Sequence, residues 1–271
     1  RMFRGLAGFT PKRALPAWRR DRFDDRARAK SGAREVVLLV DTFNRYFEPE
    51  NVRAAIRVLQ AAGYRVHAAD PVEGSRPLCC GRTFLSAGLV DEARAEAKRV
   101  LDALAPWLAR GIPIIGLEPS CLFTLRDEYG VLLPGTEALA KNAFLFEEFL
   151  ANESTAGRLD LKLKAIATEA LLHGHCHQKA FAVMGAVEHV LRLVPELNVR
   201  LSWRPCRCRR HQLAGTRSSM ERSARRCTWL GFWKVHWICV PLKPPADAFC
   251  ASKGDCARAL RPCRPSLSRC R

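Results

Sequence analysis

The sequence predicts an α/β fold built from two duplicated parallel-sheet units, of which the second is incomplete. Continuous apolar runs such as residues 35–41 are typical of parallel strands that are buried on both faces. These runs alternate with amphipathic helical segments, and this alternation favours parallel pairing through crossover connections. The same strand–turn–helix order starts again near residue 168, which indicates an internal duplication.

The first unit is expected to contain three strands and the helices that connect them. Its clearest helix runs from Pro49 to Ala61, because proline suits the first helical position and Gly63 can end the helix. The apolar periods predict the other elements in chain order: strands over 35–41, 64–69 and 112–117, and helices over 91–110, after Cys121 and over 136–150.

The second unit is expected to repeat this pattern and then to stop early. Its apolar runs predict a strand over 169–172, a helix over 179–193 and a last strand over 198–203. Two other segments lack a sustained period. Residues 1–34 are expected to be a basic linker with a short helix over 18–30, and residues 152–157 an exposed connector.

The charge is distributed unevenly along the 271 residues. The net charge is +18 overall, but residues 35–200 carry −3, whereas residues 1–34 and 201–271 carry +8 and +13. Because the part that is expected to fold is slightly acidic, the sequence predicts no nucleic-acid partner. Binding of polyanions by the two basic ends is a weaker alternative.

The composition changes abruptly at about residue 204. Beyond it Arg, Cys, Trp and Pro dominate without a helical or strand period, as in GC-rich coding DNA that is read in the wrong frame. Residues 204–271 are therefore expected to be a non-native or disordered basic tail of a truncated, frameshifted chain. The alternative is a cysteine-rich zinc module with Cys206, Cys208, His211 and Cys227 as ligands.

The expected location is the cytoplasm, with peripheral association with the inner membrane left open. No apolar run reaches the length of a membrane-spanning helix, and the N-terminus lacks the apolar core of a signal peptide. The body of the chain has the pattern of an intracellular α/β protein, and not that of a secreted disulfide scaffold. Arg1 in place of an initiator methionine indicates that the chain begins inside a longer one.

Three cysteine-bearing turns, each placed after an expected strand, are the candidate functional site. A single free cysteine usually packs as a small hydrophobic residue. Turns that follow strands, however, are where α/β folds build their sites, so the set favours metal or iron–sulfur ligation. Nearby helix amides are expected to lower the pKa of these thiols. The candidate metal-binding residues are Cys79, Cys80, Cys121, Cys176, His175 and His177.

The histidines of the third turn have two possible roles. In an extended chain His173, His175 and His177 would share one face and Cys176 the other, so they could not all bind one metal with that cysteine. For some of the three histidines, a hydrogen bond to a metal-binding residue is then favoured over direct binding of the metal. Glu118 is expected to be a hydrogen-bonding residue of its loop.

These motifs resemble the cysteine-rich (CCG) region of iron–sulfur oxidoreductases, especially the C-terminal part of FAD/iron–sulfur D-lactate or glycolate dehydrogenases. The resemblance covers residues 35–200, with a first CCG unit over 35–155 and a partial second unit over 156–203, both Rossmann-like. It rests on five segments in order: residues 40–64, LCCGRTFLSAGLVDEARAEA (78–97), 111–129, 142–150 and LHGHCHQKA (172–180).

The resemblance implies specific residue roles. Cys79, Cys80 and Cys121 correspond to the later ligands of the first copy, whereas its early position, residues 41–44, has no cysteine. Cys176 corresponds to the early cysteine of the second copy, whose own CCG turn is missing after residues 198–201. The second site is therefore expected to be incomplete.

The resemblance also implies a function. The chain would be the electron-transfer module of a flavin-linked 2-hydroxy-acid (lactate or glycolate) dehydrogenase with an iron–sulfur cluster. FAD would sit on a missing upstream domain, since no glycine-rich dinucleotide motif is present. FAD and ferredoxin-type domains or subunits of the same dehydrogenase would be the partners, and the membrane quinone pool an indirect one.

A zinc-binding structural domain without a redox role is the alternative function. Cys79, Cys80, Cys121 and one imidazole would supply the three sulfurs and one nitrogen of a tetrahedral zinc site. The sequence leaves open whether iron–sulfur or zinc is bound.

Overall fold

A computed structural model describes residues 18–24, 32–71 and 76–201, together with the strand at 238–239. All of these residues belong to one compact unit, Arg1–Pro241. The expected disordered tail, residues 204–271, therefore lies outside the described residues apart from 238–239. Most of the expected basic linker, residues 1–34, lies outside them as well.

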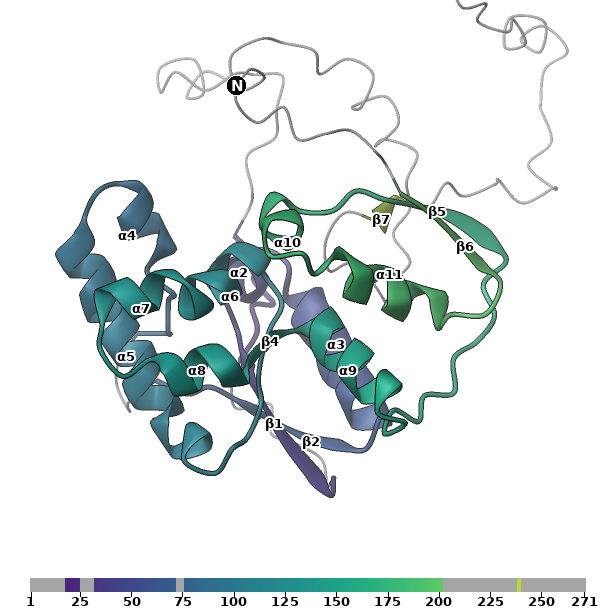
Figure 1. Cartoon of the computed structure of the whole chain (residues 1–271), viewed down its shortest axis with the longest axis horizontal. Helices are drawn as coiled ribbons and strands as arrows, with labels where there is room; N and C mark the ends of the chain where they lie inside the picture. The colour runs from purple at the N-terminus through teal and green to yellow at the C-terminus, as the bar shows by residue number, and fades with distance from the viewer. Residues whose placement is uncertain (1–17, 25–31, 72–75, 202–237, 240–271) are drawn as a thin grey trace, which may run out of the picture. The chain divides into compact units, whose positions relative to one another are not determined.

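The main sheet, part of which is labelled in Figure 1, has four parallel strands. They are β1 (Arg34–Leu39), β2 (Tyr64–Ala68), β3 (Ile114–Gly116) and β4 (Ala143–Leu145). The order is β2-β1-β3-β4, with Val36 beside Val66 and Leu38 beside Ile115. The prediction of a parallel α/β sheet is confirmed.

Helices cover both faces of this sheet, which explains why residues 36–39 of its first strand are all apolar. Along β1, Val36 and Leu38 pack into one hydrophobic cluster, and Val37 and Leu39 pack into a second. Successive side chains of a strand point to opposite faces, so a strand that is covered twice needs apolar residues at every position.

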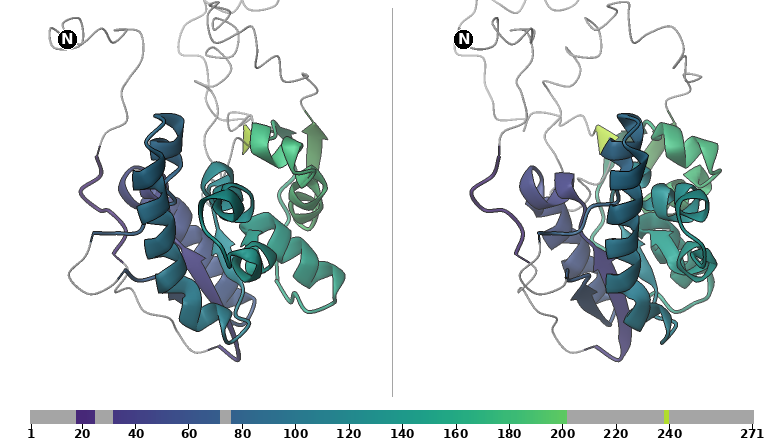
Figure 2. Two further views of the ribbon diagram at one scale, coloured as in Figure 1. Left: turned by 60° about the vertical axis from the view of Figure 1, so that its left-hand side comes forward. Right: turned by 90° about the vertical axis from the view of Figure 1, so that its left-hand side faces the viewer.

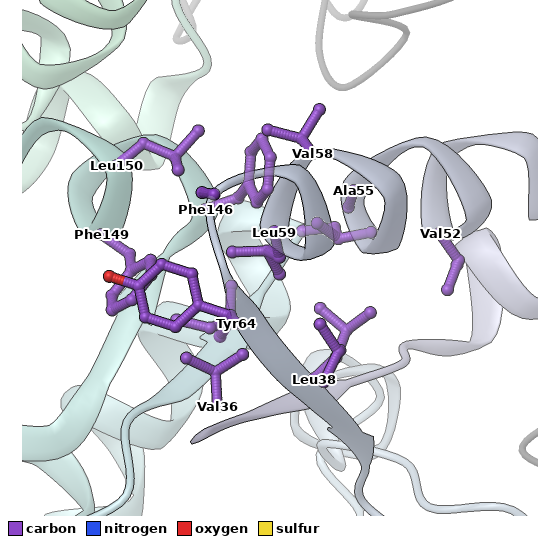
Figure 3. Close-up of a cluster of buried hydrophobic side chains, with 14 of the residues drawn as sticks. Val36, Leu38, Val52, Ala55, Val58, Leu59, Tyr64, Phe146, Phe149 and Leu150 are labelled. Atoms are coloured by element: carbon purple, nitrogen blue, oxygen red, sulfur yellow. The ribbon is translucent and has the colours of Figure 1, made fainter. Parts of the chain in front are cut away.

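The first face is covered by α3 (Pro49–Ala61) and α9 (Phe146–Thr155). Apolar residues recur along α3 at the spacing of one helical face, and they pack against the aromatic side chains of α9 over β1 and β2 (Figure 3). The shared core consists of Val36, Leu38, Val52, Ala55, Val58, Leu59, Tyr64, Phe146, Phe149 and Leu150.

The second face is covered by the long helix α5 (Val90–Leu108), whose alanines and leucines pack against β1 and β3; Figure 2 shows it running alongside the strands. The shorter helices α6 (Pro119–Arg126), α7 (Glu128–Leu132) and α8 (Glu137–Asn142) complete this layer. Two further single-turn helices, α2 (Thr42–Tyr46) and α4 (Arg82–Ser86), start directly after loops that follow β1 and β2.

The second unit begins with two parallel strands, β5 (Thr168–Leu172) and β6 (Leu197–Leu201). The two-residue strand β7 (Ile238–Cys239) pairs with β5 in the antiparallel direction. Helix α11 (Met184–Arg192) packs Val187 and Leu191 on Leu172. The strand–helix–strand order agrees with the sequence prediction, whereas duplication of the first unit stays a prediction.

The second unit packs directly on the first. Val190 and Val194 belong to the cluster that contains β1 and α3. On the other face, the ring of Phe181 stacks on that of Phe123, with 4.1 Å between ring centroids. The turn that follows β5 therefore lies against α6.

Two expected helices differ from the structure. The segment 136–150 is not one helix, because Ala143–Leu145 pairs with β3 as a strand between α8 and α9. The helix expected over 179–193 is interrupted at Ala182, which has a positive φ of 56°. Its first turn is instead α10 (Cys176–Ala180), which begins earlier.

Two connecting segments also differ from their predictions. The part of 18–30 that is described, residues 18–24, is not helical. Trp18 packs there on Tyr46 and Phe47, with ring centroids 5.1 and 4.8 Å apart. Most of the connector that was expected over 152–157 forms the last turn of α9. In both cases tertiary contacts outweigh the weak local preference of a polar segment.

Within the described ranges, no helix combines the length and the apolar character that a bilayer crossing demands.

A buried carboxylate ties β1, β2 and α9 together. Glu153 accepts hydrogen bonds from Arg34 at 2.8 Å and from Arg158 at 2.6 Å, and the Tyr64 hydroxyl also donates to it. The bond from Arg158 is the largest cause that lowers the pKa of Glu153, burial opposes it, and the bond from Tyr64 lowers the pKa further.

We expect Glu153→Gln to lower the free energy of unfolding by about 1–3 kcal/mol at pH 7, since it removes a charge from a buried hydrogen-bonded group. A lowered pKa stabilises the folded state above the pKa of the unfolded chain, and this contribution is lost as the pH falls through the folded-state pKa. Urea unfolding from pH 7 to pH 3 should therefore show the difference between the two proteins shrinking in acid. The exposed Glu92→Gln is the control, and an equal effect of both variants would contradict the assignment.

Candidate metal centre

The Cys79-Cys80-Gly81 turn lies between β2 and α4. Gly81 has a φ of 80°, a left-handed conformation that glycine adopts at little cost. A Cβ atom at this position would lie 3.0 Å from the carbonyl oxygen of Ala93 on α5. Both the conformation and the close approach to α5 therefore require glycine, and the turn is held against the helix.

Cys80 is the central thiol of a group of three. Its side chain is 7% exposed and shares hydrogen bonds with the thiols of Cys79 and Cys121. The sequence analysis expected Cys121 in a turn, but the residue is helical. It lies in the first turn of α6, because Pro119 starts that helix and the Glu118 side chain caps it. The structure therefore brings these three cysteines together from two separate loops.

The segment after β1 reaches the same place. The Thr42 hydroxyl hydrogen-bonds the thiol of Cys79, and the charge of Asp41 acts on Cys121. Asp41 caps α2 by accepting hydrogen bonds from the backbone nitrogens of Phe43 and Asn44 at 2.9 and 3.0 Å. Residues 41–44, where the resemblance led us to look for a further cysteine, thus lie beside the three thiols.

The pKa of each of the three thiols is raised above its ordinary value. The hydrogen bond with Cys80 is the largest cause for Cys79, and burial comes next. For Cys80, the bond with Cys121 raises the pKa most. The bond with Cys80 lowers the pKa of Cys121, but burial and the negative charge of Asp41 outweigh it.

Backbone amides act on these thiols in the direction that the sequence analysis expected. Hydrogen bonds from the amides of Gly81 and Arg82 lower the pKa of Cys79 and Cys80. The bond with Cys80 at Cys79, the bond with Cys121 at Cys80 and the burial of both thiols together raise the pKa by more than these amides lower it. The net shift of the pKa is therefore upward, toward the protonated thiols, in the metal-free protein.

Two buried side chains hold the Cys79-Cys80-Gly81 turn in place. The hydroxyl of Tyr129, a fully buried residue on α7, donates to the carbonyl oxygen of Cys80 at 3.2 Å. Glu96 on α5 pairs with Arg76, which lies just before the turn, and with Arg99 at 2.8 Å. Sequence reasoning missed both residues, although they lie in the segments 78–97 and 111–129, because their contacts with the turn form only when the helices pack.

The turn after β5 contacts the first unit through an arginine. Arg82, the first residue of α4, donates from Nη2 to the His177 Nε2 atom at 3.1 Å and also pairs with Glu128. An arginine has only donors, so the lone pair of Nε2 is used in this contact. Binding of a metal by neutral His177 would require this contact to break.

The sequence analysis considered an extended chain over residues 173–177, but the structure has a helix there that begins at Cys176. His175 is the N-cap of α10, and its Nδ1 atom accepts from the backbone nitrogen of His177 at 3.2 Å. Cys176 is the first residue of α10 and is exposed. Side chains alternate between two faces only in a strand, so this argument does not decide which of these side chains could bind the same metal.

Glu118 is a hydrogen-bonding residue, as predicted. Its carboxylate accepts from the backbone nitrogen of Ser120 at 3.2 Å and from the Ser120 hydroxyl.

His173 is the remaining histidine of the third turn. Burial lowers the pKa of its imidazole, and the nearby charge of Lys179 lowers it further.

The three thiols have the chemistry of metal ligands, but their present arrangement does not fit a bound metal. Thiolates suit both zinc and iron–sulfur clusters. In the part of the chain that is described, however, no group of three or more His, Cys, Asp or Glu side chains is arranged to hold an ion. The sulfurs form a hydrogen-bonded series from Cys79 through Cys80 to Cys121. Metal binding would require these side chains to reorient and to lose their protons.

Fold and site together define an α/β protein with a group of three thiols, the central one buried, in loops and helix ends beside a parallel sheet. Its similarity to known proteins lies among dehydrogenases. One relative is a component of the anaerobic glycerol-3-phosphate dehydrogenase of Escherichia coli K12. The two are 28% identical over 167 residues, which is 61% of this chain and 41% of that protein.

Two D-2-hydroxyglutarate dehydrogenases are also similar. The protein from Pseudomonas putida KT2440 is 32% identical over 140 residues, which is 50% of this chain and 13% of the relative. The Escherichia coli K12 protein is 25% identical over 150 residues, or 55% and 14% of the two chains. This chain thus spans less than half the length of these relatives. No family model matches it, and no solved structure matches it significantly.

In the metal-free protein we expect iodoacetamide to react with four cysteines, Cys79, Cys80, Cys121 and Cys176, in the order of their exposure. The exposed Cys176 should be alkylated at least about tenfold faster than Cys80, which is buried and protonated. Pulsed alkylation followed by peptide mass spectrometry measures each site separately. The same pulse in denaturant is the control, where the rates should converge. Equal rates at Cys80 and Cys176 in the folded protein would contradict this description.

Proposed function

We propose that this chain is the electron-transfer module of a flavin-linked dehydrogenase that acts on 2-hydroxy acids. The observation that carries the proposal is the meeting of Cys79, Cys80 and Cys121 from two loops of one α/β unit. Similarity to a component of one dehydrogenase and to two D-2-hydroxyglutarate dehydrogenases supports the oxidoreductase class. Lactate and glycolate are 2-hydroxy acids as well, and we propose them as its substrates.

In this proposal Cys79, Cys80 and Cys121 bind an iron–sulfur cluster as thiolates once their side chains have reoriented. The cluster would supply one-electron chemistry. The chain's own contribution is to hold the sulfurs and to exclude water from them. Cys80 lies in a hydrophobic cluster with Leu78 and Phe123, and Tyr129 fixes its backbone carbonyl. Burial of this kind sets the environment on which a cluster's potential depends.

We further propose that FAD and ferredoxin-type clusters belong to other domains or subunits of the same enzyme. The glycerol-3-phosphate dehydrogenase relative from Escherichia coli is named as one subunit of its enzyme, which supports a multi-subunit arrangement. The proposed site of action is cytoplasmic, and electrons would reach the membrane quinone pool only through these partners. For Cys176, His175 and His177, binding of a metal stays a proposal that requires rearrangement around Arg82.

A zinc-binding structural domain is the second candidate. The number of cysteines favours zinc over an iron–sulfur cluster with four thiolates, since the described residues bring three thiols together. Three sulfurs and one further ligand are a common zinc set. This candidate predicts a metal that stabilises the fold without any redox activity.

Metal analysis and visible absorption of the anaerobically purified protein distinguish the two candidates. An iron–sulfur centre predicts iron, sulfide and broad charge-transfer bands that bleach with dithionite, whereas a zinc domain is colourless. In either case Cys80→Ser should remove about one centre per chain relative to the unmodified protein, because Cys80 is the central thiol. Cys176→Ser is the control for the three-thiol centre and should retain it. A protein that lacks both metals, or keeps them in Cys80→Ser, would overturn the proposed site.

A cysteine at position 42 should complete the set of four ligands. The Thr42 side chain already hydrogen-bonds Cys79, so Thr42→Cys places a fourth sulfur within reach of the thiols. Competition with a chromophoric chelator should show zinc binding that is tighter by about tenfold or more. Thr83→Cys makes the same change at an exposed position of α4 and should leave the affinity unchanged. Equal affinities of both variants would contradict the role given to residues 41–44.

A further inference from the structure

The turn after β5 contains buried nitrogen atoms that the three-thiol site does not use. The Nδ1 atoms of His173 and His177, Nε2 of Gln178 and Nζ of Lys179 are shielded from solvent and have no hydrogen-bond partner among the described residues. Buried polar atoms are hydrogen-bonded in the large majority of cases. Four such nitrogens within seven residues therefore indicate a missing group that accepts hydrogen bonds.

Three of these side chains are held close to residues 173–175. Lys179 runs back along the turn, since its Cε atom lies 3.3 Å from the position that a Cβ on Gly174 would occupy. Its charge also acts on His173. Gln178 is only 1% exposed and folds back too, because its Oε1 atom accepts from the backbone nitrogen of His175 at 3.0 Å. The fourth nitrogen belongs to His177, whose ring is turned toward Arg82.

Gly174 is needed in this turn because it leaves room for neighbouring side chains, and not because the backbone has an unusual conformation. Gly174 is absent from the residues with positive φ in the described part of the chain. A Cβ atom there would lie 2.2 Å from the sulfur of Met184, so the glycine lets Met184 and Lys179 approach the backbone. The end of Lys179 is thereby kept near the carboxyl end of β5, the edge where open α/β sheets bind ligands.

The chemistry of these groups points to an anion. A lysine ammonium has three donors and no acceptor, and a glutamine amide nitrogen is also only a donor. Lys179 forms no ion pair with any described carboxylate, whereas the nearby Arg82 is paired with Glu128. A buried ammonium without a counter-charge is costly, and a bound oxyanion would remove that cost.

We propose that His173, Gln178 and Lys179 form a binding site for a small oxyanion, a carboxylate or a phosphate, at the carboxyl end of β5. Lys179 provides the charge, and the Gln178 amide and the His173 imidazole provide directed hydrogen bonds. The site uses no cysteine, and it depends neither on a metal at the three thiols nor on the proposed electron-transfer function.

Thermal unfolding of the full chain tests the site, with oxalate and inorganic phosphate as probes and sodium chloride at matched ionic strength as the reference. We expect at least one probe to raise the Tm in a saturable way, as a ligand that binds the folded state must. Lys179→Met should weaken that binding by about tenfold or more, because it removes a charge-assisted hydrogen bond. The matched control Lys141→Met changes an exposed lysine and should respond as the unmodified protein does.

Two results would overturn the site: no rise in Tm beyond the chloride reference, or equal apparent affinities of Lys179→Met and Lys141→Met for the probe that binds. Removal of an unpaired buried charge should leave the probe-free Tm of Lys179→Met equal to or above that of the unmodified protein. A response to oxalate alone assigns a carboxylate ligand, and a response to phosphate alone assigns a phosphate. Gln178→Glu, which adds a negative charge to the site, should abolish either response.

Discussion

Burial of the parallel sheet on both faces is the constraint on which the rest of the structure depends. Val36 to Leu39 alternate between two hydrophobic clusters, so helices must cover β1 from both sides. Parallel strands then need long connections, and the loops that follow the strands all leave from the same edge. The cysteines of two such loops are thereby brought together, along with Thr42 from a third.

The burial of the thiols favours one protonation state in the metal-free protein and would favour the opposite one when a cation is bound. In the metal-free state the low polarity around Cys80 and its shared hydrogen bonds favour protonated sulfur. A bound cation would reverse this preference, because its charge stabilises thiolates most strongly where water is excluded. Gly81, Tyr129 and Glu96 fix the backbone around the thiols, so adjustment is confined to short side chains.

Arg82 connects the two units at the point where their turns meet. It follows the Cys79-Cys80-Gly81 turn directly, donates to His177 of α10, and is neutralised by Glu128 of α7. Lys179, three residues from Cys176, has no such carboxylate among the described ion pairs. One cation of this region is thus paired within the protein, whereas the other is the charge of the proposed oxyanion site.

The sequence by itself determined the parallel α/β class, the helix Pro49–Ala61 and the Cys79-Cys80-Gly81 turn, because these follow from apolar periods, a proline and a glycine that act locally. Tertiary structure alone decided the rest. Ala143–Leu145 became a strand because β3 offers a hydrogen-bonding edge, although its sequence suits a helix. Cys121 entered a helix through the cap that Glu118 forms. Three features depend on burial among distant residues: the proximity of Thr42 to Cys79, the raised pKa values of the thiols, and the Lys179 nitrogen that finds no partner among the described residues. Local sequence patterns carry no information about such contacts, since these form only when separate elements pack.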